Sequence, residues 1–242
     1  MNVNEMPLFE AFAGVRFRRG SQLPIYDPHE LQSFTLSRFM PPELMGFSGR
    51  ALVIDPDVFA LADVGELFAT DLRDNAIAAC RGKHGWDSSV MLLNCAKLAH
   101  WKISDILAAL KNLSGDYFDL IQLRMEPKIL ELPSKWNSHD RIGPETKMVH
   151  MTRVHTQPWK TGLHLDYLPA KSRRLFGLHM LFVKPIAHYQ PHPEPEVEKA
   201  FLDLFTEAVA AGAVTEADIA DAIARKFVRA DIRERVGLAR DA

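Results

Sequence analysis

Arg50-Ala-Leu-Val-Ile-Asp-Pro-Asp57 is the stretch of sequence that decides the fold. Its first five residues are mostly apolar and favour extended structure, and the Asp-Pro pair then ends the run in a turn. This pattern predicts a buried strand with Asp55 and Asp57 directly after its carboxyl end. Because ligands of open α/β sheets bind outside the carboxyl ends of strands, we expect both carboxylates at the binding edge.

Short apolar runs and helical patterns alternate on either side of this strand. Further strands are predicted at residues 75–80 and 88–94. Helices are predicted at residues 33–44, 64–68, 95–101 and 104–110. Such alternation favours an α/β fold, with a sheet that has helices on both faces.

The composition changes after Pro185. Gln190-Pro-His-Pro-Glu-Pro-Glu196 predicts an extended linker, because repeated proline excludes helix. Amphipathic helices are predicted at residues 197–211 and 215–228, the second with an apolar stripe of Ile219, Ile223 and Phe227. We therefore predict an α/β body over residues 1–185 and a small helical C-terminal appendage over residues 186–242.

Composition limits the classes of function. The chain has 242 residues, 47% of them hydrophobic, with 29 Lys and Arg against 31 Asp and Glu. This near balance argues against nucleic acid as a partner, because nucleic-acid binders usually carry a basic excess. Cys80 and Cys95 lie in apolar stretches, which favours buried thiols in a reducing compartment. With no signal peptide pattern or membrane-spanning run, the predicted location is cytoplasmic.

Asp55 and Asp57 are the first candidates for chemistry. Two carboxylates one residue apart can both reach a hard divalent cation, which could act as a Lewis acid on a diphosphate leaving group. The alternative is plain: Asp-Pro makes a good turn, and a chain with 17 aspartates contains about one Asp-x-Asp by chance. The motif by itself leaves both interpretations open.

His150 and Lys160 are the second pair of candidates. His150 ends the short apolar run Lys147-Met-Val-His150 and could supply a nitrogen ligand to the same cation. Lys160 lies between Pro158 and Gly162, where a loop could present its charge to phosphate. The alternatives are a core histidine with its hydrogen bonds satisfied and an ordinary surface lysine.

Five ordered blocks connect these residues. They are Phe34-Thr-Leu-Ser-Arg38-Phe-Met-Pro-Pro-Glu-Leu, Ala51-Leu-Val-Ile-Asp-Pro-Asp through Asp63-Val-Gly-Glu-Leu-Phe, Trp86-Asp-Ser-Ser-Val-Met-Leu-Leu-Asn94, Leu132-Pro-Ser-Lys-Trp-Asn137, and Thr146-Lys-Met-Val-His150 through Gln157-Pro-Trp. This succession resembles the retaining, metal-dependent glycosyltransferases of the glycogenin and bacterial lipopolysaccharide-galactosyltransferase type, family eight. The resemblance covers roughly residues 33–162 and implies a GT-A-like mixed sheet flanked by helices.

The resemblance implies a role for each matched position. Asp55, Asp57 and His150 would hold Mn²⁺ or Mg²⁺, with Asp55 also near the donor ribose. Arg38 would face the donor sugar or its phosphates, and Asp87 would lie near the donor sugar. The implied reaction transfers a sugar, with retention, from a nucleotide diphosphate donor, most typically UDP-linked, to a glycan or lipid-linked acceptor.

Four departures from the family pattern stand beside these expectations. Asp87-Ser88-Ser89 replaces Asn-Ser-Gly, and Gln157-Pro-Trp replaces Lys-Pro-Trp, so that Lys160 is the substitute for the diphosphate lysine. The family's Asp-Gln-Asp has no clean match, and Asp119 is the nearest candidate for its catalytic role. Only 37 residues precede Arg38, so the family's first strand and helix are expected to be missing.

Other surfaces and other functions remain open. Basic residues could contact the inner face of a membrane or form solvated faces; they are Lys171, Arg173, Arg174, Arg225, Lys226 and Arg229. His179, His188 and His192 could bind a metal, although solvated loop histidines explain them better. A sheet edge exposed by the missing strand would favour a homo-oligomer. The rival functions are a non-catalytic binding or partner protein on this fold and a metal-dependent nucleotidyl or phosphoryl transferase.

Overall fold

The computed structural model describes residues 6–28, 30, 32–166, 174–175, 178–179 and 187–238. The chain forms two compact units. The first comprises Met1–Ser138 with Glu145–Met148, and the second comprises His139–Pro144 with Val149–Ala242. The boundary predicted near residue 185 falls among residues outside the described part, so it stays a prediction.

Most helices and strands are short, and the longest are the strand Gly85–Asn94 and the helix Pro195–Ala210. In the first unit they are α1 (Pro7–Glu10), the 3₁₀ helix η2 (Ser33–Phe39), α2 (Pro41–Leu44), β1 (Arg50–Ile54), β2 (Val58–Ala60), α3 (Gly65–Phe68), β3 (Ile77–Gly82), β4 (Gly85–Asn94), η3 (Cys95–Lys97), α4 (Ile103–Lys111), α5 (Tyr117–Ile121), β5 (Ile129–Glu131) and η4 (Ser134–Trp136). Next come β6 (Ser138–His139), β7 (Met148–His150), η5 (Val154–Thr156), η6 (Pro158–Lys160), β8 (Arg174–Leu175), β9 (Leu178–His179), α6 (Pro195–Ala210), α7 (Glu216–Ala224) and α8 (Ile232–Arg235).

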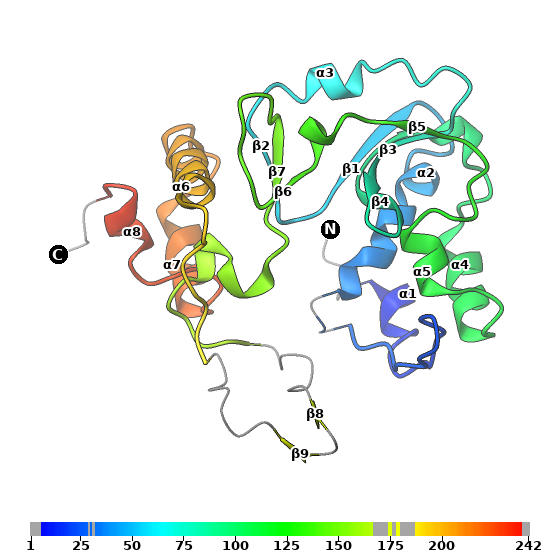
Figure 1. Ribbon diagram of the computed structural model, residues 1–242, viewed down its shortest axis with the longest axis horizontal. Helices are drawn as coiled ribbons and strands as arrows, with labels where there is room; N and C mark the ends of the chain where they lie inside the picture. Colours follow the sequence, from blue (N-terminus) through cyan, green and yellow to red (C-terminus); the bar gives the residue numbers. More distant parts are fainter. Residues whose placement is uncertain are drawn as a thin grey trace. The chain divides into compact units, whose positions relative to one another are not determined.

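A four-stranded sheet in the order β1-β4-β3-β5 forms the centre of the first unit (Figure 1). β4 pairs antiparallel with both β1 and β3, and β3 pairs parallel with β5, so the sheet is mixed. Two smaller sheets have the orders β2-β7-β6 and β8-β9. The predicted mixed α/β fold is therefore confirmed, and β1 occupies the predicted residues, while β4 begins three residues before the predicted position.

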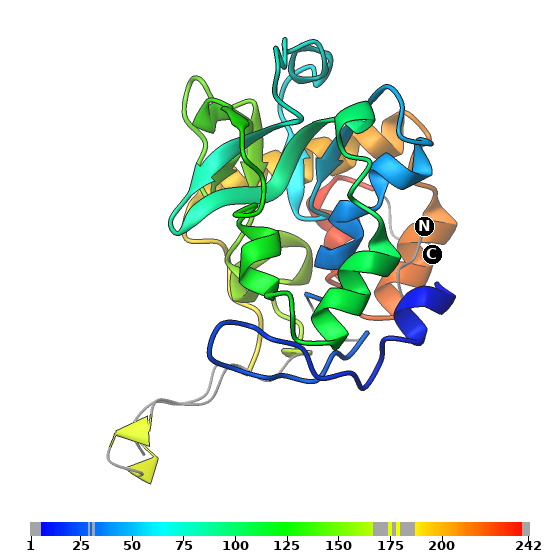
Figure 2. The same cartoon turned by 90° about the vertical axis from the view of Figure 1, so that its right-hand side faces the viewer.

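Both faces of the central sheet are buried, because its residues alternate between two apolar clusters. Ile77 and Met91 face a cluster that contains Phe39 of η2 and Leu98. Ala78 and Leu92 face the opposite cluster, which contains Leu67 of α3, Trp136 of η4 and Met148 of β7. Figure 2 shows α4 and α5 together on one side of the strands. The second face is covered mainly by short elements.

The N-terminal part of the first unit packs around helices rather than strands. Its apolar side chains form a third cluster with α4 and α5, and the members include Phe9, Phe12, Phe17, Tyr26, Leu36, Leu107 and Tyr117. In the described residues before Ser33 the chain forms α1 and isolated bridges, such as Arg16 with Ile25, and no strand of a named sheet.

Several local predictions are corrected. The helix predicted at residues 33–44 divides into η2 and α2 at Pro41, and the one predicted at 95–101 shortens to η3. The segment predicted as an extended linker contains the buried residue His192. Its last proline, Pro195, begins α6, because proline suits the first turn of a helix.

Helices α6, α7 and α8 gather in the second unit (Figure 1). α7 begins with a capping box between Thr215 and Asp218 and ends at Ala224, so Phe227 lies beyond the helix and is exposed. The predicted apolar stripe thus ends at Ile223. No helix of the described residues has the length and apolar character needed to cross a membrane.

Only some of the basic residues that were predicted to form an exposed surface are exposed in the structure. Lys171 and Arg173 lie outside the described residues, and Arg225 and Lys226 are exposed. Arg229 is instead buried, donating to Asp231 at 2.6 and 2.8 Å and to Glu198 at 3.0 Å. The hydrogen bond from Arg229 is the main reason why the pKa of Asp231 lies below its ordinary value. Arg229 thus joins α6 to the segment before α8.

Both cysteines are free and buried, as predicted. Burial is the largest cause that raises the pKa of the Cys80 thiol to about 12, and the nearby carboxylates of Asp87 and Glu131 add to it. The thiolate is the reactive form of cysteine, so Cys80 is an inert packing residue at neutral pH.

We predict that Arg229→Ala destabilises the protein by about 2–3 kcal/mol, because it removes the buried cation that pairs with both Asp231 and Glu198 and leaves Glu198 with the more exposed Arg235. The melting temperature should fall by roughly 5–10 °C in calorimetry. The control is Arg225→Ala, which removes an exposed ion pair with Asp221 within α7 and its C-cap and should cost less than about 0.5 kcal/mol. Equal losses in the two variants would contradict the structural role of Arg229.

Candidate functional site

The two predicted aspartates lie in one turn at the end of β1. Ile54 pairs with Val90 of β4, and the Asp55 N–H donates to the Ser89 carbonyl at 2.9 Å, which continues the ladder by one residue. The Val58 N–H then donates to the Asp55 carbonyl at 3.1 Å and closes the turn that contains Asp57. Asp55 is buried, with 5% of its surface exposed. The turn and the paired carboxylates are therefore both present.

Arg38 binds Asp55 with two nitrogen atoms. Its Nε donates to Asp55 Oδ1 at 2.8 Å, and its Nη2 forms an ion pair with Asp55 Oδ2. Its Nη1 donates to Ser88 Oγ at 2.8 Å. This fork-like arrangement uses the planar geometry that distinguishes arginine from lysine. Arg38, which the resemblance assigned to the donor, thus fixes the orientation of the Asp55 carboxylate.

Asp87-Ser88-Ser89 forms an irregularity in β4 where the family has Asn-Ser-Gly. Ala79 pairs with Met91, but the next residue, Cys80, pairs with Asp87, so the β4 residues in between bulge out of the ladder. The Ser89 N–H and hydroxyl both donate to Asp87 Oδ1, at 2.9 and 2.5 Å. The amide of Asn137 in turn donates to Ser89 Oγ at 3.0 Å. Hydrogen bonds therefore hold this bulge without a glycine.

Two histidines lie side by side on β6 and β7. The rings of His139 and His150 are perpendicular, with their centroids 5.1 Å apart. The N–H of Asp140, directly after His139, donates to the His150 carbonyl at 2.9 Å. His150 is buried and His139 is exposed. His139 was not predicted as a site residue, although it follows the matched Leu-Pro-Ser-Lys-Trp-Asn block by two residues.

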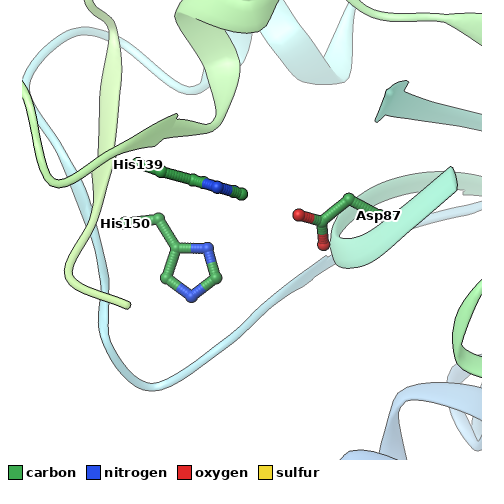
Figure 3. Close-up of side chains that lie close together, drawn as sticks. All are labelled: Asp87, His139 and His150. Carbon is green, nitrogen blue, oxygen red and sulfur yellow. The ribbon is translucent and has the colours of Figure 1, made fainter. Parts of the chain in front are cut away.

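The described residues contain two groups that could hold a metal ion. One consists of Asp55, Asp57 and His150. The other consists of Asp87, His139 and His150, the side chains drawn in Figure 3. Carboxylates suit Mg²⁺ and Mn²⁺, and an imidazole shifts the preference towards Mn²⁺ and later transition metals. The donor set therefore fits the divalent cation that the sequence predicted.

Lys160 and Asp119 are placed differently from the other candidates. The Lys160 ammonium pairs with Asp166 and lies 3.4 Å from the Tyr189 hydroxyl, and only 13% of this side chain is exposed. Asp119 lies on α5 and accepts from Arg124 Nη1 at 2.9 Å. Neither residue belongs to the two ligand groups of the described residues.

Asp166 keeps its negative charge to low pH. Burial opposes ionisation, but hydrogen bonds from Lys160 and Tyr189 outweigh it and place the pKa of Asp166 below its ordinary value. The Lys160 charge is thereby neutralised within the protein.

Comparisons with known proteins find partial similarities. No family model matches the chain. Over 175 residues the chain is 29% identical to Protein CDI of Arabidopsis thaliana, which covers 60% of this chain and 62% of that protein. The structure is similar to glycosyltransferase GlyE of Streptococcus pneumoniae, with 21% identity, a TM-score of 0.42, and coverage of 60% of this chain and 41% of that one.

A second solved neighbour is galactosyltransferase LgtC in complex with donor and acceptor sugar analogs. The identity is 18% and the TM-score is 0.44, over 56% of this chain and 63% of that chain. The chain thus spans less than two thirds of the length of Protein CDI, GlyE and LgtC. Both structural neighbours are glycosyltransferases, the class that the sequence resemblance predicted, and each is matched over part of its chain.

We predict that Lys160→Met raises the pKa of Asp166 towards its ordinary value of 3.8, because it removes a hydrogen bond and a positive charge. A folded-state pKa below the unfolded value stabilises the protein above the unfolded pKa, and the stabilisation is lost as the pH falls through the folded value. The variant should therefore lose less stability on acidification than the wild type does. Carboxyl ¹³C NMR titration measures the shift.

The matched control is Lys199→Met, which removes an exposed lysine paired with Asp203 on α6. It should leave the titration of Asp166 unchanged. An Asp166 titration that stays the same in Lys160→Met would show that Lys160 is not its partner in solution.

Proposed function

We propose that this chain binds a divalent cation, Mn²⁺ or Mg²⁺, through Asp55, Asp57 and His150, and that it is a retaining glycosyltransferase. The observation that supports the proposal best is the turn at the end of β1, which begins with the buried Asp55 and contains Asp57 one residue after Pro56. These two and His150 form a candidate metal-binding group and are also the three positions that the resemblance to family eight implied as metal ligands.

The proposed donor is a nucleotide diphosphate sugar, UDP-linked in the first instance, and the acceptor is a glycan or a lipid-linked glycan. When bound, the cation would neutralise the departing diphosphate. The anomeric carbon loses its bond to the phosphate oxygen and gains a bond to the acceptor oxygen. The proton of the acceptor hydroxyl passes to the leaving phosphate oxygen, so that no protein base is required.

The chain's own residues would prepare the site for this transfer. Arg38 holds the Asp55 carboxylate in a fixed orientation, and Ser88 holds Arg38. Asp87, fixed by Ser89, would accept hydrogen bonds from hydroxyls of the donor sugar. Lys160 would help to bind the diphosphate if its ammonium group left Asp166 and paired with a phosphate oxygen instead. Asp119 would act in catalysis only in a side-chain conformation in which its hydrogen bond with Arg124 is broken.

A second candidate function is a non-catalytic binding or partner protein of the same fold. It is favoured by the ion pairs of the two cations that were expected at the donor. Arg38 is paired with Asp55 and Lys160 with Asp166, so both positive charges are already neutralised by the protein. A protein that only binds a sugar or a partner needs no free cation for a leaving diphosphate.

We predict that UDP binds in calorimetric titrations only when Mn²⁺ is present, and that Asp57→Ala weakens this binding more than about 100-fold, because it removes a ligand rather than a supporting residue. The fold of the variant should persist, since Asp57 is half-buried and lies in the turn beyond β1, outside the strand itself. The matched control is Asp203→Ala, which removes an exposed carboxylate on α6 and should bind like the wild type.

The outcomes separate the two candidate functions. Metal-dependent UDP binding, together with release of UDP from UDP-hexoses, supports the transferase. Metal-dependent binding with no release of UDP under any acceptor tested supports the non-catalytic protein. A folded wild type that does not bind UDP, or an Asp57→Ala variant that binds it fully, overturns the proposed donor site.

A further inference from the structure

Asp140 is a buried aspartate that comes immediately after His139 in the chain, and the proposed reaction gives it no role. Asp140 is 6% exposed and has a backbone φ of 53°, a left-handed conformation that aspartate tolerates better than most residues. Its N–H donates to the His150 carbonyl at 2.9 Å. Burying a carboxylate is costly unless hydrogen bonds compensate it, so its partners indicate what it does.

The Asp140 carboxylate closes a ring of hydrogen bonds around the His150 carbonyl. The Thr152 hydroxyl donates to Asp140 Oδ2, while the Thr152 N–H donates to the His150 carbonyl at 3.1 Å. The Arg153 N–H donates to Asp140 Oδ1 at 3.3 Å. The backbone of His150 and of the residues that follow it is thus attached to Asp140, the residue that follows His139.

His192 connects this ring to helix α6. Its side chain is fully buried, and its Nε2 lies 3.3 Å from Asp140 Oδ1. Its Nδ1 lies 3.1 Å from both the Glu194 nitrogen and the Glu194 carbonyl oxygen, and because a carboxylate only accepts, Nε2 is the donor in the hydrogen bond to Asp140. Glu194 is the N-cap residue of α6. A continuous set of hydrogen bonds therefore runs from the start of α6 to His150.

We propose that Asp140 and His192 are positioning residues for His139 and His150. Asp140 fixes the backbone from which both imidazoles project, and His192 fixes Asp140. Hydrogen-bonded residues behind metal ligands commonly change metal affinity by about 10–100-fold, because they set the orientation of the ligands. The inference that this positioning serves a cation rests on the proposed function, whereas the positioning itself does not.

Two variants and two controls test the proposal in the full chain. Asp140→Asn replaces one acceptor oxygen by an amide that faces a donor. His192→Leu removes the donor to Asp140, and His192→Gln retains a nitrogen donor in nearly the same place. The matched controls are His188→Leu, an exposed histidine of the same segment, and Asp203→Asn on α6.

The first readout is the set of histidine ring signals in ¹H–¹⁵N NMR spectra of the metal-free protein. Asp140→Asn and His192→Leu should shift the signals of His139 and His150, and neither control should shift them. The second readout is the affinity for Mn²⁺ alone, which should fall about tenfold in the same two variants. His192→Gln should stay close to the wild type in both.

Each result has a definite meaning. Unchanged His139 and His150 signals in a folded Asp140→Asn protein overturn the positioning role, whether or not a metal binds. Shifted signals with unchanged Mn²⁺ affinity overturn its service to the cation. Shifted signals in a protein whose wild type binds no Mn²⁺ support the positioning and overturn the proposed metal site. If Asp140→Asn does not fold, the comparison of His192→Leu with His192→Gln gives the same decision.

Discussion

The ion pair between Arg38 and Asp55 is the interaction on which the rest of the site depends. It joins three segments that are far apart in sequence: the helix η2, the end of β1 and, through Ser88, the bulge in β4. Among the residues that the structure describes, β1 is an edge strand of the central sheet and pairs with β4. Without Arg38 the end of this strand would carry a buried carboxylate with no cation, and an uncompensated buried charge is strongly destabilising.

The same pair constrains what Asp55 can do. A carboxylate has about four lone-pair positions, and a bidentate arginine occupies one on each oxygen. Coordination of a cation by Asp55 is therefore compatible with the ion pair, but only from the directions that Arg38 leaves. Arg38 thereby sets the geometry of the ligand, and its own charge lowers the total negative charge that the site offers to a cation. A transfer site would rely on the carboxylate of Asp57 for further negative charge and on the histidines for neutral nitrogen ligands.

The sequence was informative where a single segment decides its own structure. The run from Arg50 to Ile54 forms a strand and the Asp-Pro pair ends it in a turn, as predicted, but only Val53 of this strand is buried and Ile54 is exposed. The alternation of residues in β3 and β4 was less clear, because both faces of these strands are buried and the strands contain few polar residues. The bulge at Ser88 and Ser89 could not be predicted, because hydrogen bonds from Ser89 to Asp87 and from Asn137 to Ser89 hold it without the glycine of the Asn-Ser-Gly pattern.

Contacts between distant residues account for most of what the sequence analysis missed. Repeated proline correctly excluded helix around His192. The expectation that this histidine is exposed to solvent was wrong, because its ring is buried against Asp140, 52 residues earlier in the chain. His139 was overlooked for the same reason: no spacing to another histidine marks it, and only the strand pair β6 and β7 brings it beside His150. Matched motifs identify the side chains expected to bind a substrate or metal. The residues that orient those side chains depend on the fold of each chain. In this protein the buried pair Asp140 and His192 belongs to the second kind, and a buried carboxylate next to a matched block is the sign by which such residues can be found.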